Sequence, residues 1–280
     1  MAQQMSRAAA WGRKSKRRLT PEAEFHTLRL LQSVEKHLYN TTIRKVPWFI
    51  KRFGAGEVLL KPLRVIFAPA IIPLLPKRTF EFQGNLFSCF YHRYNMTWAG
   101  ERAVEVPIAK WYLEQYRGKS VLEVGNVLSH YFPVSHDILD KFEKGKGIIN
   151  QDIVDFKPAK QYDLALSIST FEHIGFDDEA SEPSGQKIRS AILSCLRHLK
   201  ADGKLVLTVP LNYNPDLDTM IRDGKLNAAR EFYLRRVQRL TWETSTKAEA
   251  LKHHYKTPFP YANAILVAEF SKSGARPQAA

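Results

Sequence analysis

The sequence predicts an α/β fold with a mostly parallel sheet. From Ser120 onward, short apolar runs alternate with helical or loop segments, and such alternation typically gives a parallel sheet covered by helices. The last two apolar runs have no periodic helix of good length between them, which predicts an antiparallel pair at the edge of the sheet. The seven expected strands are Ser120–Val124, Asp137–Asp140, Gly147–Gln151, Asp163–Ser167, Lys204–Val209, Glu231–Val237 and Ala264–Phe270.

Helices and a hairpin are expected around these strands. A helix over Gly185–Leu199 is expected to end near Gly203, which would take the left-handed conformation that follows many helices. In the N-terminal part, apolar spacings of three and four predict an amphipathic helix. The expected N-terminal elements are a helix over 22–45, a β-hairpin over 79–93 that turns at Gln83-Gly84-Asn85, and a helix over 97–116 that contains Pro107.

The chain of 280 residues is long enough for one large domain or two small ones. Its composition, 44% hydrophobic and 25% charged, is that of a globular protein. Its two cysteines, Cys89 and Cys195, exclude a disulfide framework and a CxxC pair. We expect a basic disordered tail over 1–20, a lid or substrate region over 21–118, the sheet domain over 119–270 and a disordered tail over 271–280.

The net charge of +14 is concentrated near the N-terminus. Residues 1–100 carry 17 Lys and Arg against 5 Asp and Glu, whereas residues 101–200 carry 13 against 15. A nucleic-acid-binding protein is expected to have a basic face on its folded core, which the mildly acidic middle does not predict. The tail 1–20 is interpreted as a solvated segment, with contact to lipid or nucleic-acid phosphates as the alternative.

The segment 46–76 is apolar but interrupted by prolines, and its longest apolar run, Val65–Leu75, is too short to span a membrane. Lysines and arginines flank this run. One interpretation is that the segment packs over the main domain as a lid or substrate wall. The other is that it enters a membrane interface, where its cations would meet anionic headgroups.

Carboxylates follow three of the predicted strands, at the edge where open parallel sheets bind ligands. Glu123 stands next to Gly125 and Asn126 at the end of the first strand, and a glycine there permits a sharp turn. Asp140 ends the second strand and could accept hydrogen bonds from ribose hydroxyls. Asp152 follows the third strand and could accept from an adenine amine, with Ile153 against the ring. Three acids would repel a pyrophosphate, so the pattern favours a nucleoside that carries positive charge.

The successive segments VLEVG, QDI, YDLALSISTFEHIG and LKADGKLVLTVP resemble the motifs of class I S-adenosylmethionine-dependent methyltransferases. The resemblance covers about Glu101 to Phe270 and implies a Rossmann-like seven-stranded sheet with a reversed C-terminal hairpin. It implies S-adenosyl-L-methionine as the cofactor, with Glu123 and Gly125 near its methionine part, Asp140 on the ribose and Asp152 at the adenine. The family usually has three glycines in its first loop, where this sequence has Gly125 alone, followed by a short connection with room for only a stubby helix.

Ser169 and His173 follow the fourth predicted strand, where substrate would meet cofactor. Ser169 is assigned to the cofactor site, and His173 is the candidate catalytic residue because a histidine could take a proton from a nucleophile. Structural alternatives remain for three residues. His173 could orient its loop, Glu123 could cap a helix or pair with a lysine, and Asp152 could pair with a nearby lysine. No metal site is expected.

The sequence therefore predicts methyl transfer from S-adenosylmethionine to an unidentified acceptor. The acceptors considered are an envelope glycan, a lipid precursor or another small molecule. The protein is expected to be cytoplasmic. An anionic membrane surface is considered as a further partner of its basic N-terminal region. Two alternative functions rest on other features of the sequence. The missing glycines suggest an inactive protein that only binds or scaffolds, and the basic tail suggests a membrane- or RNA-associated protein. The sequence predicts no oligomeric state.

Overall fold

The computed structural model describes residues 66–177 and 183–272, all of which belong to one compact unit, Pro62–Ala280. The predicted tail 1–20 and the predicted helix 22–45 lie outside the described residues. So do most of segment 46–76 and, beyond Lys272, the predicted tail 271–280.

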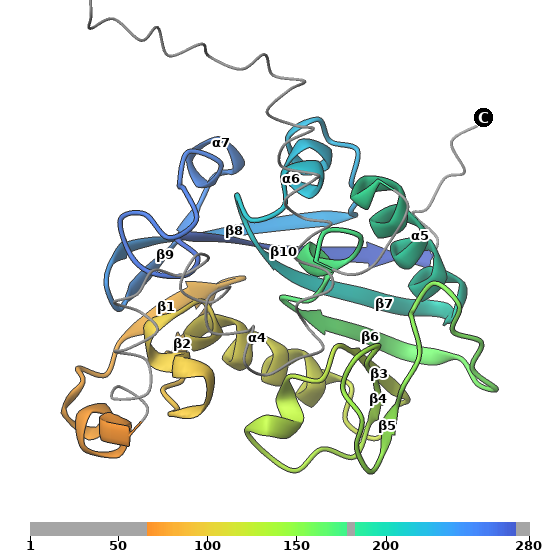
Figure 1. Cartoon of the computed structure of the whole chain (residues 1–280), viewed down its shortest axis with the longest axis horizontal. Coiled ribbons are helices and arrows are strands. Elements are labelled where there is room, and N and C mark those ends of the chain that lie inside the picture. Colours follow the sequence, from red (N-terminus) through yellow and green to blue (C-terminus); the bar gives the residue numbers. More distant parts are fainter. Residues whose placement is uncertain (1–65, 178–182, 273–280) are drawn as a thin grey trace, which may run out of the picture. The chain divides into compact units, whose positions relative to one another are not determined.

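An eight-stranded sheet forms the centre of this unit (Figure 1), in the order β5-β4-β3-β6-β7-β10-β8-β9. Neighbouring strands are parallel from β5 to β7, whereas β10 is antiparallel to both β7 and β8. The predicted Rossmann-like fold with a reversed C-terminal hairpin is thus confirmed. The strands are β3 (Val121–Val124), β4 (Asp137–Leu139), β5 (Ile148–Ile149), β6 (Tyr162–Ile168), β7 (Leu199–Pro210), β8 (Arg230–Gln238), β9 (Thr241–Ser245) and β10 (Ala264–Ser271).

Two details of the predicted sheet are wrong. The sheet has eight strands instead of seven, because β9 pairs with β8 in an antiparallel ladder. The last strand, β10, lies inside the sheet between β7 and β8, so the edge is formed by β9. Strand β9 has the sequence TWETS, in which only Trp242 is buried. A short polar strand of this kind gives no period-2 apolar signal.

Helices cover both faces of the sheet (Figure 1). Helices α5 and α6 pack on one face, in a core that includes Ile188, Cys195 and Ile221. Helix α4 and the β1–β2 hairpin cover the other face, where Val104 and Ile108 share a core with strand residues. The helical elements are η2 (Ile72–Leu74), η3 (Tyr94–Ala99), α4 (Arg102–Gln115), η4 (Leu128–His130), η5 (Phe171–His173), α5 (Ser184–Arg197), α6 (Pro215–Arg222) and α7 (Lys247–Ala250).

The predicted hairpin is present, with β1 (Thr79–Phe82) paired antiparallel to β2 (Asn85–Ser88). Its two-residue turn, Gln83-Gly84, has positive φ at both positions, as a type I′ turn requires. The Gln83 side chain donates to Glu269 Oε1 of β10 and to the Tyr112 hydroxyl of α4. The hairpin tip is therefore hydrogen-bonded to both the sheet and the helix that covers it.

The described end of segment 46–76 is only partly packed. Ile72 and Leu75 contact a buried cluster that contains Met96 and Trp98, whereas Leu74 is 84% exposed. In the part of the chain that the structure describes, no helix has the length and apolar character needed to cross a membrane.

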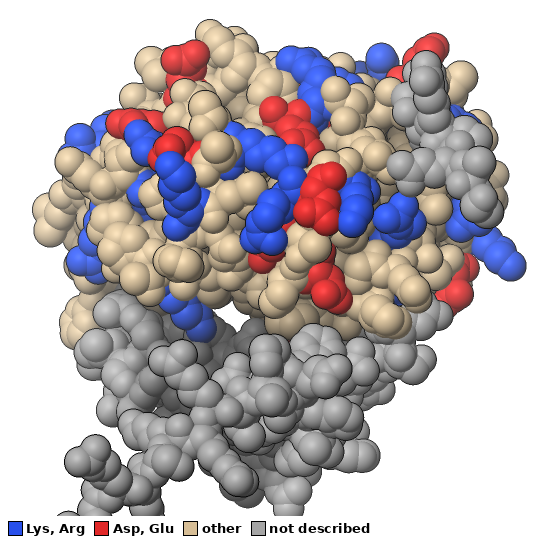
Figure 2. Space-filling view, turned by 90° about the horizontal axis from the view of Figure 1, so that it is seen from above, with Lys and Arg blue, Asp and Glu red and all other residues tan. Residues whose placement is uncertain are grey.

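Basic and acidic side chains are mixed on the face seen in Figure 2, which views the molecule from above relative to Figure 1. Lys and Arg side chains alternate there with Asp and Glu among the described residues. The described residues of that face do not present the continuous basic stripe on which a nucleic-acid backbone would lie.

Gly203 does not occupy the predicted position at the end of a helix. Helix α5 ends at Arg197, and Gly203 lies within β7 without a positive φ. It stands where the β6–β7 register is irregular between the pairs Tyr162↔Leu199 and Leu164↔Lys204. A Cβ on Gly203 would come within 2.9 Å of both Leu199 Cβ and Tyr162 O. The glycine is required there because the bulged backbone passes so close to its neighbours.

We expect Gly203→Ala to lower the free energy of unfolding by about 1–3 kcal/mol, because the added methyl overpacks a rigid site. The matched control is Gly185→Ala in helix α5, where the nearest atom to a Cβ would be at 3.6 Å. That substitution should stabilise by about 0.5–1 kcal/mol, since alanine favours the helix. Urea unfolding of both variants tests this, and equal effects would contradict the packing argument.

Candidate functional site

Several loops meet at the carboxyl edge of the parallel strands, where ligands bind in open sheets of this kind. The loops after β3, β4, β6 and β7 lie there, and helix α4 begins there. Strand β10 starts at the same edge because it runs antiparallel to β7. The predicted site residues are distributed over these loops, and their contacts show what each one can do.

Glu123 is fully buried at the end of β3, and both of its carboxylate oxygens have partners. Oε1 accepts hydrogen bonds from the backbone N–H groups of Val127 (2.9 Å) and Leu128 (2.8 Å). Oε2 lies 2.6 Å from His136 Nε2. Glu123 thus holds the loop after β3 in shape, close to the capping role considered as an alternative. The helix in this loop, η4, is only three residues long, as predicted.

Asp140 holds the same loop from the neighbouring strand. Its N–H pairs with Ile149 O, which keeps it in line with β4 and β5. Oδ2 accepts from the Asn126 N–H at 2.9 Å, and Oδ1 accepts from the N–H groups of Phe142 and Glu143. Because a carboxylate has about four acceptor positions, about one remains for a ligand hydroxyl. The structure thus brings Asn126 and Asp140 together, as a nucleoside site would need.

Gly125 forms the sharp turn expected of it, with φ +88. A Cβ at this position would lie 2.2 Å from Thr170 Oγ1 and 2.8 Å from Thr170 Cγ2. The missing side chain therefore allows the loop after β6 to pack against the end of β3. Thr170 thus occupies the space beside Gly125 that was expected to admit a ligand. The sequence did not indicate this role for Thr170.

Asp152 and Ile153 have protein partners. Asp152 Oδ2 lies 3.1 Å from both Lys141 Nζ and Lys187 Nζ, which is the lysine pairing considered as an alternative. Although partial burial opposes the shift, the Val154 N–H and the two lysines hold the pKa of Asp152 below its usual value. Ile153 is 4% exposed and lies in the core under α5. Its side chain therefore has no open face for an adenine ring.

Ser169 connects β6 to a buried carboxylate on α4. Its hydroxyl donates to Glu105 Oε1 at 2.6 Å, and the Thr208 hydroxyl of β7 donates to the same oxygen at 2.8 Å. Glu105 Oε2 accepts from Arg102 Nη1 at 2.6 Å, and a second Arg102 nitrogen donates to Ser169 O. The beginning of α4 is thereby attached to the ends of two central strands.

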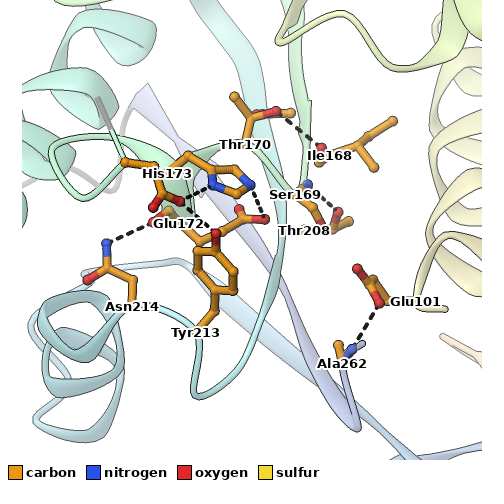
Figure 3. Close-up of polar contacts among 12 residues, drawn as sticks. Glu101, Ile168, Ser169, Thr170, Glu172, His173, Thr208, Tyr213, Asn214 and Ala262 are labelled. Atoms are coloured by element: carbon orange, nitrogen blue, oxygen red, sulfur yellow. Dashed lines mark hydrogen bonds and ion pairs between the residues drawn. The ribbon is translucent and has the colours of Figure 1, made fainter. Parts of the chain in front are cut away.

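The predicted catalytic residue His173 lies in a cluster with Glu172, Asp177 and Tyr213. Figure 3 shows His173 between Glu172 and Tyr213. His173 Nδ1 is 2.6 Å from Asp177 Oδ2, and Nε2 is 3.5 Å from Glu172 Oε1. The Tyr213 hydroxyl donates to the same Asp177 oxygen at 2.6 Å. Each ring nitrogen of His173 therefore faces a carboxylate, and its side chain is 46% exposed.

Glu172 differs from the other buried carboxylates because Oε2 has no hydrogen-bond partner among the described residues. The residue is 2% exposed. In Figure 3 its carboxyl group lies beside the His173 ring, on the side of Ser169 and Thr208. Burial raises the pKa of Glu172 to about 8, against the opposing effects of His173 and Arg102 and with a smaller raising effect of Glu105. A carboxyl group with such a pKa can exchange a proton near neutral pH.

The same contacts determine the charge of His173. Desolvation favours the neutral ring, but the Glu172 charge and the hydrogen bond to Asp177 outweigh it and raise the pKa of His173. Nδ1 is hydrogen-bonded to Asp177 and Nε2 faces Glu172 as an ion pair, and an imidazole protonated on both nitrogens has no lone pair left to accept a proton. The geometry therefore favours Glu172 over His173 as the proton acceptor of this cluster, with His173 in the orienting role considered as its alternative.

Several residues of the loops around this edge have strained backbone. Ser169, Met96, Tyr261 and Asn212 have positive φ although none is a glycine. Tyr261 donates to the sulfur of Met96, and the next residue, Ala262, donates its N–H to Glu101 of the α4 start. Strained residues persist where packing over-determines them and often lie at binding sites.

The sequence placed its candidate residues at one edge of the sheet, but it did not single out all of the polar groups that meet there. Gly125, Asn126 and Asp140 lie together, and Ser169 and His173 follow the neighbouring strand. Arg102, Glu105, Glu172 and Tyr213 were not predicted. One signal existed for Glu105, a lone acid between Val104 and Val106 on an apolar helix. Within residues 66–177 and 183–272, no three His, Cys, Asp or Glu side chains are grouped as a metal site would require.

Comparison by sequence finds no matching protein family and no matching curated protein. Comparison of structures finds S-adenosylmethionine-dependent methyltransferases, the family that the motifs resemble. One is the N-methyltransferase NodS from Bradyrhizobium japonicum WM9, in complex with S-adenosyl-L-homocysteine. It is 13% identical, with 64% of this chain and 88% of that chain covered and a TM-score of 0.40.

Two further matches are of the same kind. A TehB-like methyltransferase from Corynebacterium glutamicum is 16% identical, with 58% of this chain and 85% of that chain covered and a TM-score of 0.33. A possible histamine N-methyltransferase from Thermotoga maritima is 9% identical, with 59% and 88% covered and a TM-score of 0.36. Because these TM-scores lie below 0.5, the function is argued from the contacts within this chain.

We expect the stability of the protein to fall as pH rises from about 4.5 towards 8. Glu172 binds a proton more tightly in the folded state than in the unfolded state, so its contribution is present at low pH and is lost as the folded carboxyl ionises. His173, whose pKa is also raised, acts in the same direction. Glu172→Gln should reduce this decline by up to about 1.4 kcal/mol per pH unit. Urea unfolding between pH 5 and 9 measures it, and parallel profiles of the two proteins would contradict the assignment.

Proposed function

We propose that this chain is an S-adenosylmethionine-dependent methyltransferase that acts on a small acceptor. The observation that carries the proposal is the electrostatic character of the loop after β3. Its N–H groups at Asn126, Val127 and Leu128 are all bound by the carboxylates of Asp140 and Glu123. These donors are therefore not available to hold an anionic ligand.

This arrangement disfavours a dinucleotide cofactor. A pyrophosphate needs backbone N–H groups that point at it from the turn after the first strand. At this turn a pyrophosphate would instead meet the carboxylates of Glu123, which is buried, and Asp140, which is half-buried. A cofactor without phosphates and with a positive sulfonium suits the same edge, because its charge is attracted where a phosphate would be repelled. The residues present thus fit S-adenosylmethionine better than a dinucleotide.

The residues that would hold this cofactor follow from the strand order. Asp140, with about one acceptor position left, would accept from a ribose hydroxyl. The turn at Gly125 and Asn126 would lie against the methionine part, and Thr170, which packs against Gly125, would adjoin it together with Ser169. Asp152 remains the candidate for the adenine end, although its lysine partners would have to share it with the ring.

The bound cofactor supplies an activated methyl group, so the protein needs to orient the acceptor and exclude water more than to activate a leaving group. In this chain the Glu105 contacts fix the ends of β6 and β7 relative to α4. The cluster of Glu172, His173 and Asp177 can hold and release a proton beside them. No metal ion is invoked for this role.

Two other functions lack support of this kind. A scaffold protein would not need a buried carboxyl group with an unsatisfied oxygen at the ligand-binding edge of the sheet, since such a group lowers stability. Association with a membrane or RNA through the basic N-terminal region concerns residues outside the described ranges. The acceptor classes considered from the sequence, glycan or lipid precursor, remain expectations.

Isothermal titration calorimetry with S-adenosyl-L-homocysteine tests the cofactor site. We expect the wild-type chain to bind, and Asp140→Asn to bind about 10- to 100-fold more weakly, because a hydrogen bond to a charged group contributes about 1.5–3 kcal/mol. The amide oxygen keeps an acceptor for the Phe142 and Glu143 N–H groups, whereas the Asn126 N–H loses its acceptor. Urea unfolding of the variant therefore accompanies the titration, to show that the variant is folded.

Asp163→Asn is the matched control. Asp163 lies at the start of β6, where it accepts from Ser120 and pairs with Lys200, and the start of a parallel strand is at the opposite edge from the site. Its affinity should stay within about twofold of the wild type. No binding by the wild-type chain would contradict the proposed function, and undiminished binding by Asp140→Asn would contradict the assigned site.

Activity can be tested without knowledge of the acceptor. Extracts of cells with and without the protein would be incubated with a methyl-labelled donor and analysed by mass spectrometry. We expect at least one labelled small molecule that depends on the protein and is lost with Asp140→Asn. Identical labelling of both extracts would count against transfer activity.

A further inference from the structure

We infer that an exposed apolar patch at the beginning of the described chain docks onto an anionic lipid membrane. The patch consists of Ile66, Phe67 and Leu74, which are 68%, 57% and 84% exposed. They lie on one short helical segment, residues 66–74, in which Phe67 and Leu74 are about two helical turns apart. Large apolar side chains that are exposed together mark a surface for a membrane or for another protein. The inference does not rest on the proposed function.

The other side of this helical segment packs on the protein. Ala68 is completely buried, and Ile72 and Leu75 contact the cluster that contains Met96 and Trp98. A helix that is apolar on all sides needs an apolar environment all round, in a protein core or in a membrane. Described residues bury only one side of this segment. Its exposed side is therefore suited to an apolar environment outside the protein.

The charges beside the patch favour an anionic surface. Lys77 and Arg78 follow the patch closely, both are exposed, and neither has an ion-pair partner among the described residues. Residues 58–80 include two further cations, Lys61 and Arg64, and no Asp or Glu. Peripheral proteins bind anionic leaflets with this combination, because apolar side chains enter the interface while the neighbouring cations meet the headgroups.

The composition of the segment favours a membrane over a protein as its partner. Residues 65–76 contain no side chain that donates or accepts a hydrogen bond. Protein interfaces carry about one hydrogen bond per 100–200 Å², whereas the hydrocarbon chains of lipids require none. A second copy of this chain would also bring Lys77 and Arg78 close to the same cations across a two-fold axis, where like charges repel. The apolar run is too short to span a membrane, so the contact is with its surface.

The patch is attached to the loop that precedes α4. Met96, in the cluster under the patch, accepts a hydrogen bond from Tyr261. The next residue, Ala262, donates its N–H to Glu101, directly before α4. In Figure 1 the segment with the patch is drawn in orange and lies well apart from α5. A docked membrane would therefore lie on the side of the molecule that carries the loop before α4.

The experiment is co-sedimentation of the full-length chain with lipid vesicles. One set of vesicles contains equal parts of phosphatidylglycerol and phosphatidylcholine, and the other contains phosphatidylcholine alone. We expect the wild-type chain to bind the anionic vesicles at least about tenfold more tightly than the neutral ones. Added salt should weaken the binding to anionic vesicles, because it screens exposed charges. Lys77→Gln combined with Arg78→Gln should weaken that binding about tenfold and leave binding to neutral vesicles unchanged.

Leu74→Asp tests the apolar contact. It should weaken binding to anionic vesicles at least about tenfold, because a large apolar side chain no longer leaves water. The matched control is Leu193→Asp on α5, which adds the same charge at another exposed leucine, 49% exposed. Its binding should stay within about twofold of the wild type. Urea unfolding of both variants shows that they are folded.

Several results would overturn the inference. They are no binding by the wild-type chain, equal binding to the two kinds of vesicles, and undiminished binding by Leu74→Asp. Equal losses in Leu74→Asp and Leu193→Asp would also overturn it, because the added charge alone would then explain them. Light scattering without vesicles tests a second copy as the occupant. If the wild-type chain dimerises and Leu74→Asp restores the monomer, the patch is a contact between copies and the membrane inference fails.

Discussion

The carboxylate of Glu105 is the contact on which the candidate site depends. It is completely buried, and its oxygens accept from Arg102 on its own helix, from Ser169 at the end of β6 and from Thr208 on β7. Loss of a partner from a buried ion pair of this kind costs several kcal/mol. The contact therefore sets where the start of α4 lies relative to the central strands, and it supports the positive φ of Ser169.

Because Ser169 is held in this way, the chain turns directly from β6 into η5 and places Glu172 inside the protein. The carboxylates at this edge differ in their hydrogen-bond partners. Glu123 and Asp140 accept hydrogen bonds from backbone N–H groups and hold a loop in shape, with about one acceptor position left on Asp140. Glu172 keeps one oxygen free of partners and an elevated pKa. The carboxylates of Glu123 and Asp140 thus hold a loop in shape, whereas the carboxyl group of Glu172 can exchange a proton near neutral pH.

The loop after β3 shows how the usual glycine-rich turn can be replaced. A single glycine, Gly125, provides the left-handed residue and the close approach of Thr170. The rest of the loop is held by side-chain carboxylates of Glu123 and Asp140 instead of by further glycines. The result is a rigid, anionic loop, which suits a cationic nucleoside and would repel a phosphate.

The sequence alone determined the sheet and its reversed hairpin, and it predicted the edge at which the candidate site residues gather, because apolar runs and strand-ending acids are local signals that do not depend on distant contacts. It could not assign β9, whose five residues give no alternating apolar pattern, or the place of Gly203, which a bulge between β6 and β7 decides. Only the tertiary structure showed that Asp152 is bound by two lysines, that Ile153 is core, and that one carboxylate oxygen of Glu172 has no hydrogen-bond partner among the described residues. These properties depend on burial and on partners far away in the sequence, such as Thr208, which is 103 positions from Glu105. The acidity of a carboxyl group changes with such partners.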